Sequence, residues 1–315
     1  MLSGRVYEKM GSIVVLKQMV MIFALIILGY FMYKRKFVSE MVMKDLSAIV
    51  VNICCPAMIL ASVFQDMSDI SRKNVGIVTG IGIVYYVLLI VFGYVFVKIF
   101  RVQTKEKEAY VLMSTFGNVG FIGFPVSLAI LGHKSILYVV IFNFLYNIFI
   151  FTFGIALVRK GTEGDKKQSW TDIFTPGFVC CIFAFLIYWF QLTVPETLQN
   201  IVTYCGNACT FLSMMVIGAS VVGLNPKKII ENRKLMLFEL LRFLVLPVLI
   251  AILLKPILPD YIMRATIILM LALPTGNMPV MLAEQYNKDA HTISEGIILS
   301  TVLSVVTITI VFMFV

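Results

Sequence analysis

Ten apolar runs, each about 20 residues long, follow one another along this chain of 315 residues. That length is what an α-helix needs to cross the hydrocarbon core of a bilayer. Hydrophobic residues make up 60% of the chain and charged residues only 14%, against about 25% charged in a typical soluble domain. The runs predict an all-α membrane protein with ten transmembrane helices, at roughly residues 12–33, 43–64, 75–100, 107–131, 135–159, 173–192, 197–222, 235–255, 262–286 and 292–315.

The basic residues orient these helices, because cytoplasmic loops carry an excess of Lys and Arg. With the N-terminus outside, 17 of the 26 Lys and Arg residues fall on inside connections and 8 on outside ones, while Arg242 lies within a span. We therefore predict a multi-pass protein of the cell membrane with both termini outside. The net charge of +9 follows from this bias and from attraction to anionic lipids, so the bilayer is an expected partner and nucleic acid is not.

The ten spans divide into two halves of five, and an odd number of helices per half places the halves in opposite orientations. We predict a first repeat at residues 1–160, a short cytoplasmic linker at 161–172 and a second, inverted repeat at 173–315. Asn52-Ile53-Cys54 in the second span is echoed by Asn207-Ala208-Cys209 in the seventh, 155 positions later. The expected fold is two inverted five-helix repeats, an arrangement common among secondary transporters.

Helix-breaking residues interrupt one span in each half. The fourth span contains a Gly- and Asn-rich stretch from Gly117 to Pro125, and the ninth contains another from Pro274 to Pro279. The two closing prolines are 154 positions apart. Unwound backbone at membrane depth is tolerated only where protein buries it or where it lines a wet cavity. A matched pair of such interruptions indicates the binding site of a secondary transporter.

If Pro125 and Pro279 each begin a new half-helix, both half-helices aim their positive N-terminal ends at the bilayer centre. A helix N-terminus is a ready anion site, and nearby Asn and Thr side chains add donors. The alternative is a kinked pair of helices with no cavity, because Gly and Pro are common in membrane spans. The predicted substrate-binding residues are Asn118, Gly120, Gly123, Pro125, Pro274, Thr275, Gly276, Asn277 and Pro279.

Two charged residues lie inside the eighth span. Arg242 is near its middle, and Glu239 precedes it by three residues on the same helical face. They form either a structural ion pair or a counter-charge and coupling relay for an anionic substrate, and the sequence leaves both open. Asn residues in other spans more often join helices than bind substrate. They rank second as cavity residues: Asn52, Asn143, Asn147 and Asn207.

Machinery for catalysis or for ATP-driven transport is not visible in the sequence. The six cysteines lie in apolar spans without His or carboxylate groups at metal-ligand spacing, so neither a metal site nor a disulfide is expected. No Walker A motif, dinucleotide-binding turn or zinc signature is present. We therefore predict a transporter without a cofactor, not an enzyme. Coupling to H⁺ or Na⁺, and assembly as a homodimer, stay open.

Both breaks resemble motifs of the auxin efflux carrier (AEC) family, which groups bacterial carboxylate permeases with the plant PIN-type auxin carriers. Asn118-Val-Gly-Phe-Ile-Gly-Phe-Pro125 is similar to the family's fourth-helix motif, and the stretch from Ala272 to Pro279 is similar to its ninth-helix motif. The resemblance covers nearly the whole chain. It implies crossed broken helices in a sodium/proton antiporter-like fold, a scaffold domain that moves against them, and contact between Asn118 and a substrate carboxylate.

Two departures from the plant carriers favour the bacterial branch. Pro176 is followed by Gly177 where those carriers have Asn, and the central loop is short. We therefore expect secondary active or facilitated transport of small organic anions, malate- or malonate-like before auxin-like, by alternating access at mid-membrane. The alternatives are a sodium- or proton-coupled symporter or antiporter of the wider inverted-repeat class, and a non-transporting membrane sensor. The first usually has Asp or Glu at the crossing, and neither break contains one.

Overall fold

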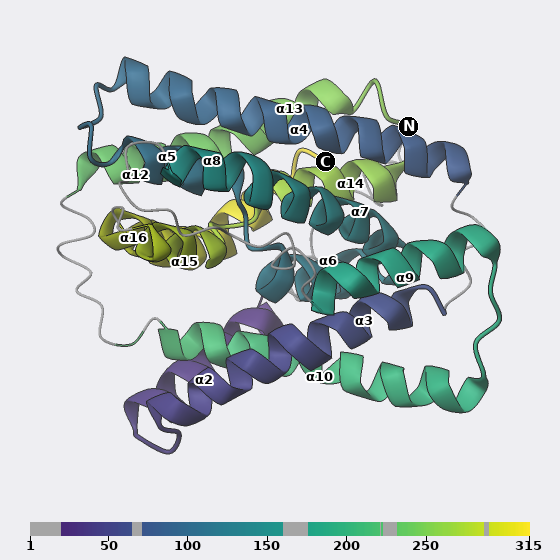
Figure 1. Cartoon of the computed structure of the whole chain (residues 1–315). Helices are drawn as coiled ribbons and strands as arrows, with labels where there is room; N and C mark the ends of the chain where they lie inside the picture. The colour runs from purple at the N-terminus through teal and green to yellow at the C-terminus, as the bar shows by residue number, and fades with distance from the viewer. Residues whose placement is uncertain (1–19, 65–70, 160–175, 221, 223–231, 287–289) are drawn as a thin grey trace.

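A computed structural model of the chain describes residues 20–64, 71–159, 176–220, 222, 232–286 and 290–315 (Figure 1). Within these ranges the chain is helical apart from short connections, and no β-strand forms. Six of the described helices are long and apolar enough to cross a membrane: Glu40–Ala61, Arg72–Ile99, His133–Val158, Glu196–Ala219, Arg233–Leu254 and Ala290–Phe312. Shorter apolar helices occupy the other four predicted runs, namely Val20–Lys34, Val119–Leu131, Pro176–Phe190 and Tyr261–Ala272.

The individual elements follow the predicted runs closely. After the Val20–Lys34 helix, the first half contains α2 (Glu40–Ile49), α3 (Cys55–Ser62), α4 (Arg72–Ile99), α5 (Lys107–Thr115), α6 (Phe124–Leu131), α7 (His133–Phe149) and α8 (Ile155–Arg159). The second half contains α9 (Pro176–Phe190), α10 (Glu196–Ser220), α12 (Arg233–Leu240), α13 (Leu246–Leu254), α14 (Tyr261–Ala272), α15 (Met278–Gln285) and α16 (Ala290–Phe312). The predicted linker at 161–172 lies outside the described residues.

Short polar side chains fix several helix starts. Ser71 accepts a hydrogen bond from the Asn74 N–H at the start of α4, and Asp260 accepts one from the Met263 N–H at the start of α14. Asn232 caps α12 in the same way through the Leu235 N–H. Each cap satisfies one of the N–H groups that a helix start leaves without an intrahelical partner. These starts are therefore encoded locally.

Four π-helical turns are described, and three of them are followed by proline. Pro56, Pro125 and Pro247 each occupy the second position of the α-helix that follows, after the turns Val50–Cys54, Val119–Gly123 and Leu241–Val245. Proline lacks an N–H and clashes with the carbonyl four residues earlier. Widening the preceding turn relieves that clash, so the helix continues through the proline.

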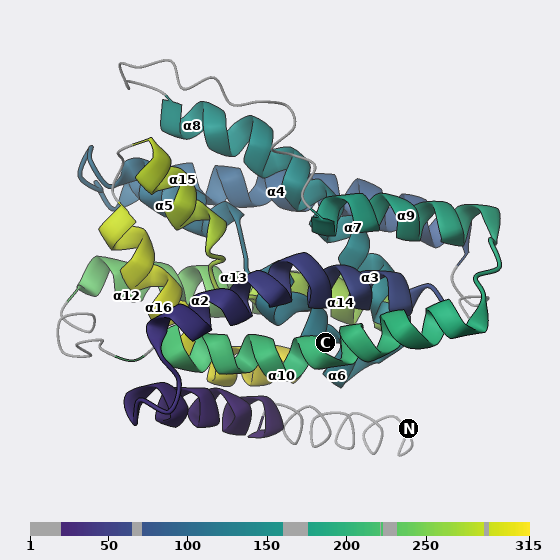
Figure 2. The same cartoon turned by 60° about the horizontal axis from the view of Figure 1, so that its bottom comes forward.

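One layer of helices covers one side of the molecule. Figure 1 shows α2, α3 and α10 together along its lower side, while α4 and α13 lie along the opposite side. α10 packs against α3, and the Val20–Lys34 helix lies against α10 (Figure 2). Gly218 of α10 faces the backbone of Ile26 closely enough that a Cβ atom there would collide with it. Small residues allow such close packing of membrane helices. We call Val20–Lys34, α2, α3 and α10 the covering layer.

Large apolar side chains also lie on the outside of the described helices. Val84 and Val91 of α4 are exposed, as are Leu249 and Leu253 of α13. A helix that is apolar on its outer face as well as its inner face is expected where lipid is the solvent. The helices therefore present a surface suited to a bilayer.

Candidate substrate site at the helix crossing

Both predicted interruptions are present as breaks in the helices. α5 ends at Thr115, the chain is unwound at Phe116–Asn118, and helix resumes with the π-helical turn Val119–Gly123. α14 ends at Ala272, and α15 begins at Met278. The second break therefore lies at 273–277, close to the predicted 274–279.

The prediction that Pro125 begins a half-helix is wrong. The second half of the fourth span begins six residues earlier, at Val119, and Pro125 lies inside it as the second residue of α6. The widened π-helical turn before α6 accommodates the proline, so no further break is needed. Pro279 does lie where expected, at the second position of α15.

The two breaks pair with each other through their backbones. The Asn118 N–H donates to the Pro274 carbonyl at 2.7 Å, and the Gly276 N–H donates to the Phe116 carbonyl at 2.9 Å. Gly117 and Thr275 form an antiparallel bridge between these bonds. Backbone groups that would be unsatisfied at membrane depth thus satisfy one another. We call this pairing the crossing.

The half-helices are arranged crosswise around this bridge. α6, the second half of one broken helix, packs beside α14, the first half of the other. α15 correspondingly packs beside α5 (Figure 2). Both second halves therefore begin at the crossing and run away from it on different sides, so two positive helix N-termini converge there.

Glycine is needed where the two backbones meet. A Cβ atom on Gly276 would lie 3.0 Å from the Gly117 carbonyl oxygen, and one on Gly123 would lie 2.9 Å from Cδ1 of Leu273. Gly120 is different, because nothing lies within 4 Å of the position its Cβ would take. Gly276 and Gly123 thus serve close packing, whereas Gly120 faces open space.

The two Asn residues of the crossing have different surroundings. Asn118 is buried, and its Oδ1 accepts a hydrogen bond from the Phe121 N–H at 3.1 Å, so it caps the second half-helix. Asn277 is exposed, and its carbonyl accepts a bond from the Val280 N–H. With its oxygen engaged, the Asn118 amide presents its NH₂ group as the remaining donor.

Sequence reasoning missed Ser300, which supports the second break from α16. Its Oγ accepts a hydrogen bond from the Thr275 N–H at 3.2 Å and donates to the Gly296 carbonyl at 2.6 Å. The Thr275 hydroxyl is fully buried and makes no hydrogen bond. The recurrence of Ser and Thr at 300, 304 and 307 was the available signal for a polar helix face.

Arg242 and Glu239 are both buried, but they do not form the ion pair that their spacing suggested. Nε of Arg242 donates to the Ser114 carbonyl and Nη1 to the Leu271 carbonyl, each at 2.7 Å. Both carboxylate oxygens of Glu239 lack a hydrogen-bond partner. Arg242 lies within the π-helical turn Leu241–Val245, whose wider winding departs from the regular α-helical spacing that would align the two side chains.

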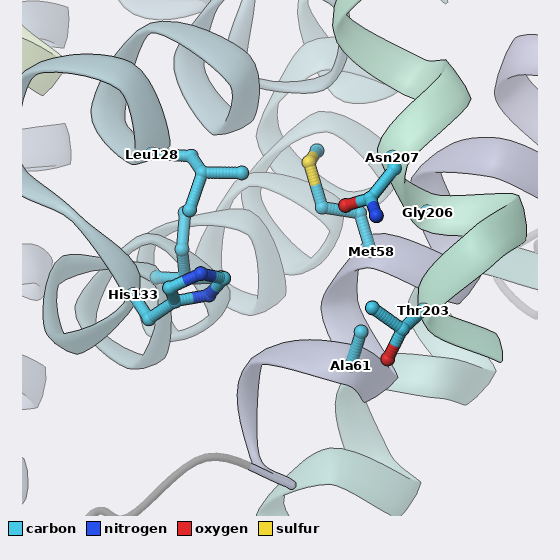
Figure 3. Close-up of a pocket in the computed structure, with 8 residues that line it drawn as sticks. Met58, Ala61, Leu128, His133, Thr203, Gly206 and Asn207 are labelled. Carbon is cyan, nitrogen blue, oxygen red and sulfur yellow. The ribbon is translucent and has the colours of Figure 1, made fainter. Parts of the chain in front are cut away.

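The second-rank Asn residues are not gathered at the crossing. Asn147 donates to the Asn143 carbonyl, Asn143 donates to Sγ of Cys181, and Asn52 donates to the Ala48 carbonyl. These are bonds within a helix or between α7 and α9. Asn207 instead lines a small cavity between the covering layer and α6–α7, beside Met58, Leu128 and His133 (Figure 3). That cavity has about 10 Å³ of free space, roughly enough for one water molecule.

Segments of the two halves also meet next to the crossing. Sγ of Cys55 in α3 lies 3.2 Å from Sγ of Cys209 in α10, and the two residues are 154 positions apart. The Cys55 thiol is also 3.2 Å from the Gly120 carbonyl. The Gly120 carbonyl therefore faces the covering layer.

This arrangement defines a class of protein: a helical membrane carrier with two broken helices that cross at mid-length. Comparison with known proteins agrees. The model of the family described as membrane transport protein, the auxin efflux carrier family, matches residues 14–312. The chain belongs to that family, whose members are transporters and not enzymes.

Curated relatives of the chain are transporters too. An uncharacterized transporter of Methanocaldococcus jannaschii is 24% identical over 295 residues, which cover 90% of this chain and 93% of the relative. A Rhizobium meliloti protein provisionally named a malonate transporter is 25% identical over 305 residues, 91% of each chain. An uncharacterized transporter of Methanothermobacter thermautotrophicus is 20% identical over 290 residues, 91% of this chain and 94% of the relative.

Proposed function

We propose that this chain carries small organic anions with carboxylate groups, malonate- or malate-like, across the cell membrane by alternating access at the crossing. The observation that carries the proposal is the backbone pairing of Gly117 with Thr275, at which two second half-helices begin. Their N-terminal ends favour a negative charge. In the first of them, the Val119 and Phe121 N–H groups already bond to Gly117 and to the Asn118 side chain. A carboxylate there would accept a hydrogen bond from the NH₂ group of the Asn118 amide and would face both positive helix ends.

The ten-span inverted arrangement is part of the proposal. Matched features support it: breaks in the fourth and ninth spans, prolines 154 positions apart, and contact between Cys55 and Cys209 at the same separation. In this arrangement both termini are outside. Of the predicted binding residues, we assign ligand contact to Asn118, Gly120, Thr275 and Asn277. Gly123, Pro125, Pro274, Gly276 and Pro279 shape the backbone around them.

Alternating access requires two bodies that move against each other. We assign the covering layer as the scaffold and the remaining helices, with the crossing, as the moving body. The Gly120 carbonyl, which contacts Cys55, and the cavity beside Asn207 both lie at the boundary between them. The malonate named for the Rhizobium relative adds support for a carboxylate substrate.

Uptake of radiolabelled malonate and malate into proteoliposomes that contain the purified full chain tests the function. We expect saturable uptake of at least one dicarboxylate, with competition by other small carboxylates and none by neutral or cationic solutes of similar size. Empty liposomes are the control. Uptake equal to that of empty liposomes for the whole carboxylate panel would contradict the proposal.

Orientation can be tested separately. A cysteine in place of Gly164 should react with a membrane-impermeant maleimide only from the cytoplasmic side, because basic residues flank that loop. A cysteine appended after Val315 should react only from outside. Reaction of both sites from the same side would contradict the inverted arrangement.

A further inference from the structure

The buried guanidinium of Arg242 lies between the C-terminal ends of the two first half-helices. Ser114 is the next-to-last residue of α5, and Leu271 is the next-to-last residue of α14. One side chain from the eighth span donates to both carbonyls at the same distance, 2.7 Å. Arg242 is fully buried. It therefore joins the two broken helices at equivalent positions.

These helix ends are where a cation is electrostatically favoured. The last carbonyls of a helix lack intrahelical partners and carry the negative end of its dipole. In carriers built from broken helices, such carbonyl ends and unwound carbonyls coordinate the coupling ion. Here three further carbonyls near the breaks already accept hydrogen bonds. Met270 accepts from the Tyr85 hydroxyl, Phe116 from Gly276, and Pro274 from Asn118.

Among the described residues, no carboxylate bonds directly to this guanidinium. In the part of the chain that the structure describes, Arg242 forms no ion pair, and the oxygens of Glu239 have no hydrogen-bond partner. One Glu239 oxygen instead lies near Gly296, 3.3 Å from the position of a Cβ atom there. Two carbonyl dipoles thus face the Arg242 guanidinium, while its Nη2 makes no hydrogen bond and the buried Glu239 carboxylate interacts with it only at longer range.

We propose that Arg242 is a tethered cation that occupies the coupling-ion position at the crossing, so that carboxylate transport by this chain needs no sodium gradient. This inference rests on the proposed function and specifies its coupling. An ammonium or sodium ion would have to leave and rebind in every cycle, whereas the guanidinium stays attached to the eighth span. A fixed positive charge also offsets the charge of an anion bound at the nearby helix N-termini.

The transport experiment compares external Na⁺, K⁺ and choline at equal ionic strength and equal pH on both sides, with malonate as the probe. Equal initial rates with all three cations are expected. Uptake several-fold faster with Na⁺ would overturn the tethered-cation proposal and leave the proposed function standing. If no carboxylate is taken up under any condition, the proposed function fails. The melting temperatures of the purified protein and its variants then test the role of Arg242 independently of transport.

The stability measurement uses the melting temperature of the purified full chain in NaCl, KCl and choline chloride. The wild type should melt at the same temperature in all three salts. Arg242→Ala removes the guanidinium from between the two carbonyls, so its melting temperature in choline chloride should be lower than that of the wild type. Na⁺ or millimolar guanidinium should raise it again. Stabilisation of the wild type by Na⁺ relative to choline would overturn the proposal. So would an Arg242→Ala protein whose melting temperature responds to Na⁺ or guanidinium no more than that of the control variant, Arg264→Ala.

Arg264→Ala is the matched control. Arg264 is also buried and donates to carbonyls, those of Leu258 and Val315, but it lies at the other end of α14. This variant should lose stability without gaining a response to Na⁺ or guanidinium. If Arg242→Ala cannot be purified, Arg242→Lys keeps a tethered charge with different geometry. It should transport more slowly and stay independent of Na⁺, and a sodium requirement in it would count against the proposal.

Discussion

The two broken helices differ in how each break is held. The first break is short and is capped from within, because Asn118 bonds to the start of the half-helix that follows it. The second is longer and relies on a neighbour, because the Thr275 N–H bonds to Ser300 of α16. The first break is therefore stabilised by a local cap, and the second by a tertiary contact. Substitutions should affect the two breaks unequally.

The largest effect is expected where the two breaks touch. Gly276→Ala places a Cβ atom 3.0 Å from the Gly117 carbonyl oxygen, against a backbone that cannot move without breaking the bridge. Overpacking of this kind costs about 1–3 kcal/mol. We expect a clearly lower melting temperature and loss of malonate uptake. Gly80→Ala is the control, because nothing lies within 4 Å of the new atom, and it should behave as wild type. Equal melting temperatures for both variants would contradict the close contact.

A smaller effect is expected from removing the support of the second break. Ser300→Ala leaves the buried Thr275 N–H without an acceptor, which costs about 1–3 kcal/mol. Thr301→Ala is a neighbouring control, because the Thr301 hydroxyl bonds only within its own helix, to the Ile297 carbonyl. We expect faster hydrogen exchange at Thr275 and Gly276 in Ser300→Ala but not at Asn118. Uniform loosening of both breaks would contradict their separate support.

The smallest effect on stability is expected at Asn277. Its side chain is exposed and caps no N–H group by a described bond, so Asn277→Ala should leave the melting temperature nearly unchanged. Asn118→Ala, in contrast, removes a helix cap worth about 1 kcal/mol. Thermal unfolding of the two variants side by side measures this difference. A larger loss from Asn277→Ala than from Asn118→Ala would reverse the comparison.

Local sequence signals located most of this architecture. Apolar runs of spanning length placed helix in all ten segments, and the Gly, Asn and Pro content of two runs located both breaks. The second break was placed almost to the residue, because Pro279 is the second residue of the helix that follows the unwound chain. For the first break, the restart of the helix was predicted at Pro125 but occurs at Val119. A π-helical turn can accommodate a proline inside a helix, and the spacing of residues in the sequence does not reveal such a turn.

Long-range contacts could not be derived in the same way. An ion pair between Glu239 and Arg242, one of the two readings that the sequence left open, assumed regular α-helical spacing, but Arg242 lies within a wide π-helical turn. Arg242 instead meets Ser114 and Leu271, which are 128 and 29 positions away. Every residue type has a backbone carbonyl, so residue identity does not indicate which carbonyl accepts a long-range hydrogen bond. Neither these acceptors nor the bridge between Gly117 and Thr275 could therefore be predicted from the sequence.

The central claim, that the crossing binds a carboxylate at Asn118, is tested most directly by equilibrium binding of radiolabelled malonate and malate to the purified chain and to Asn118→Asp. The aspartate keeps an oxygen that can accept the Phe121 N–H bond, so the melting temperature should be retained. It replaces the amide donor with a negative charge beside the bound anion. Losing one charge-assisted bond alone weakens binding about tenfold, and repulsion adds to that loss. The account predicts at least about tenfold weaker binding with unchanged stability; equal affinity in the two proteins would contradict it.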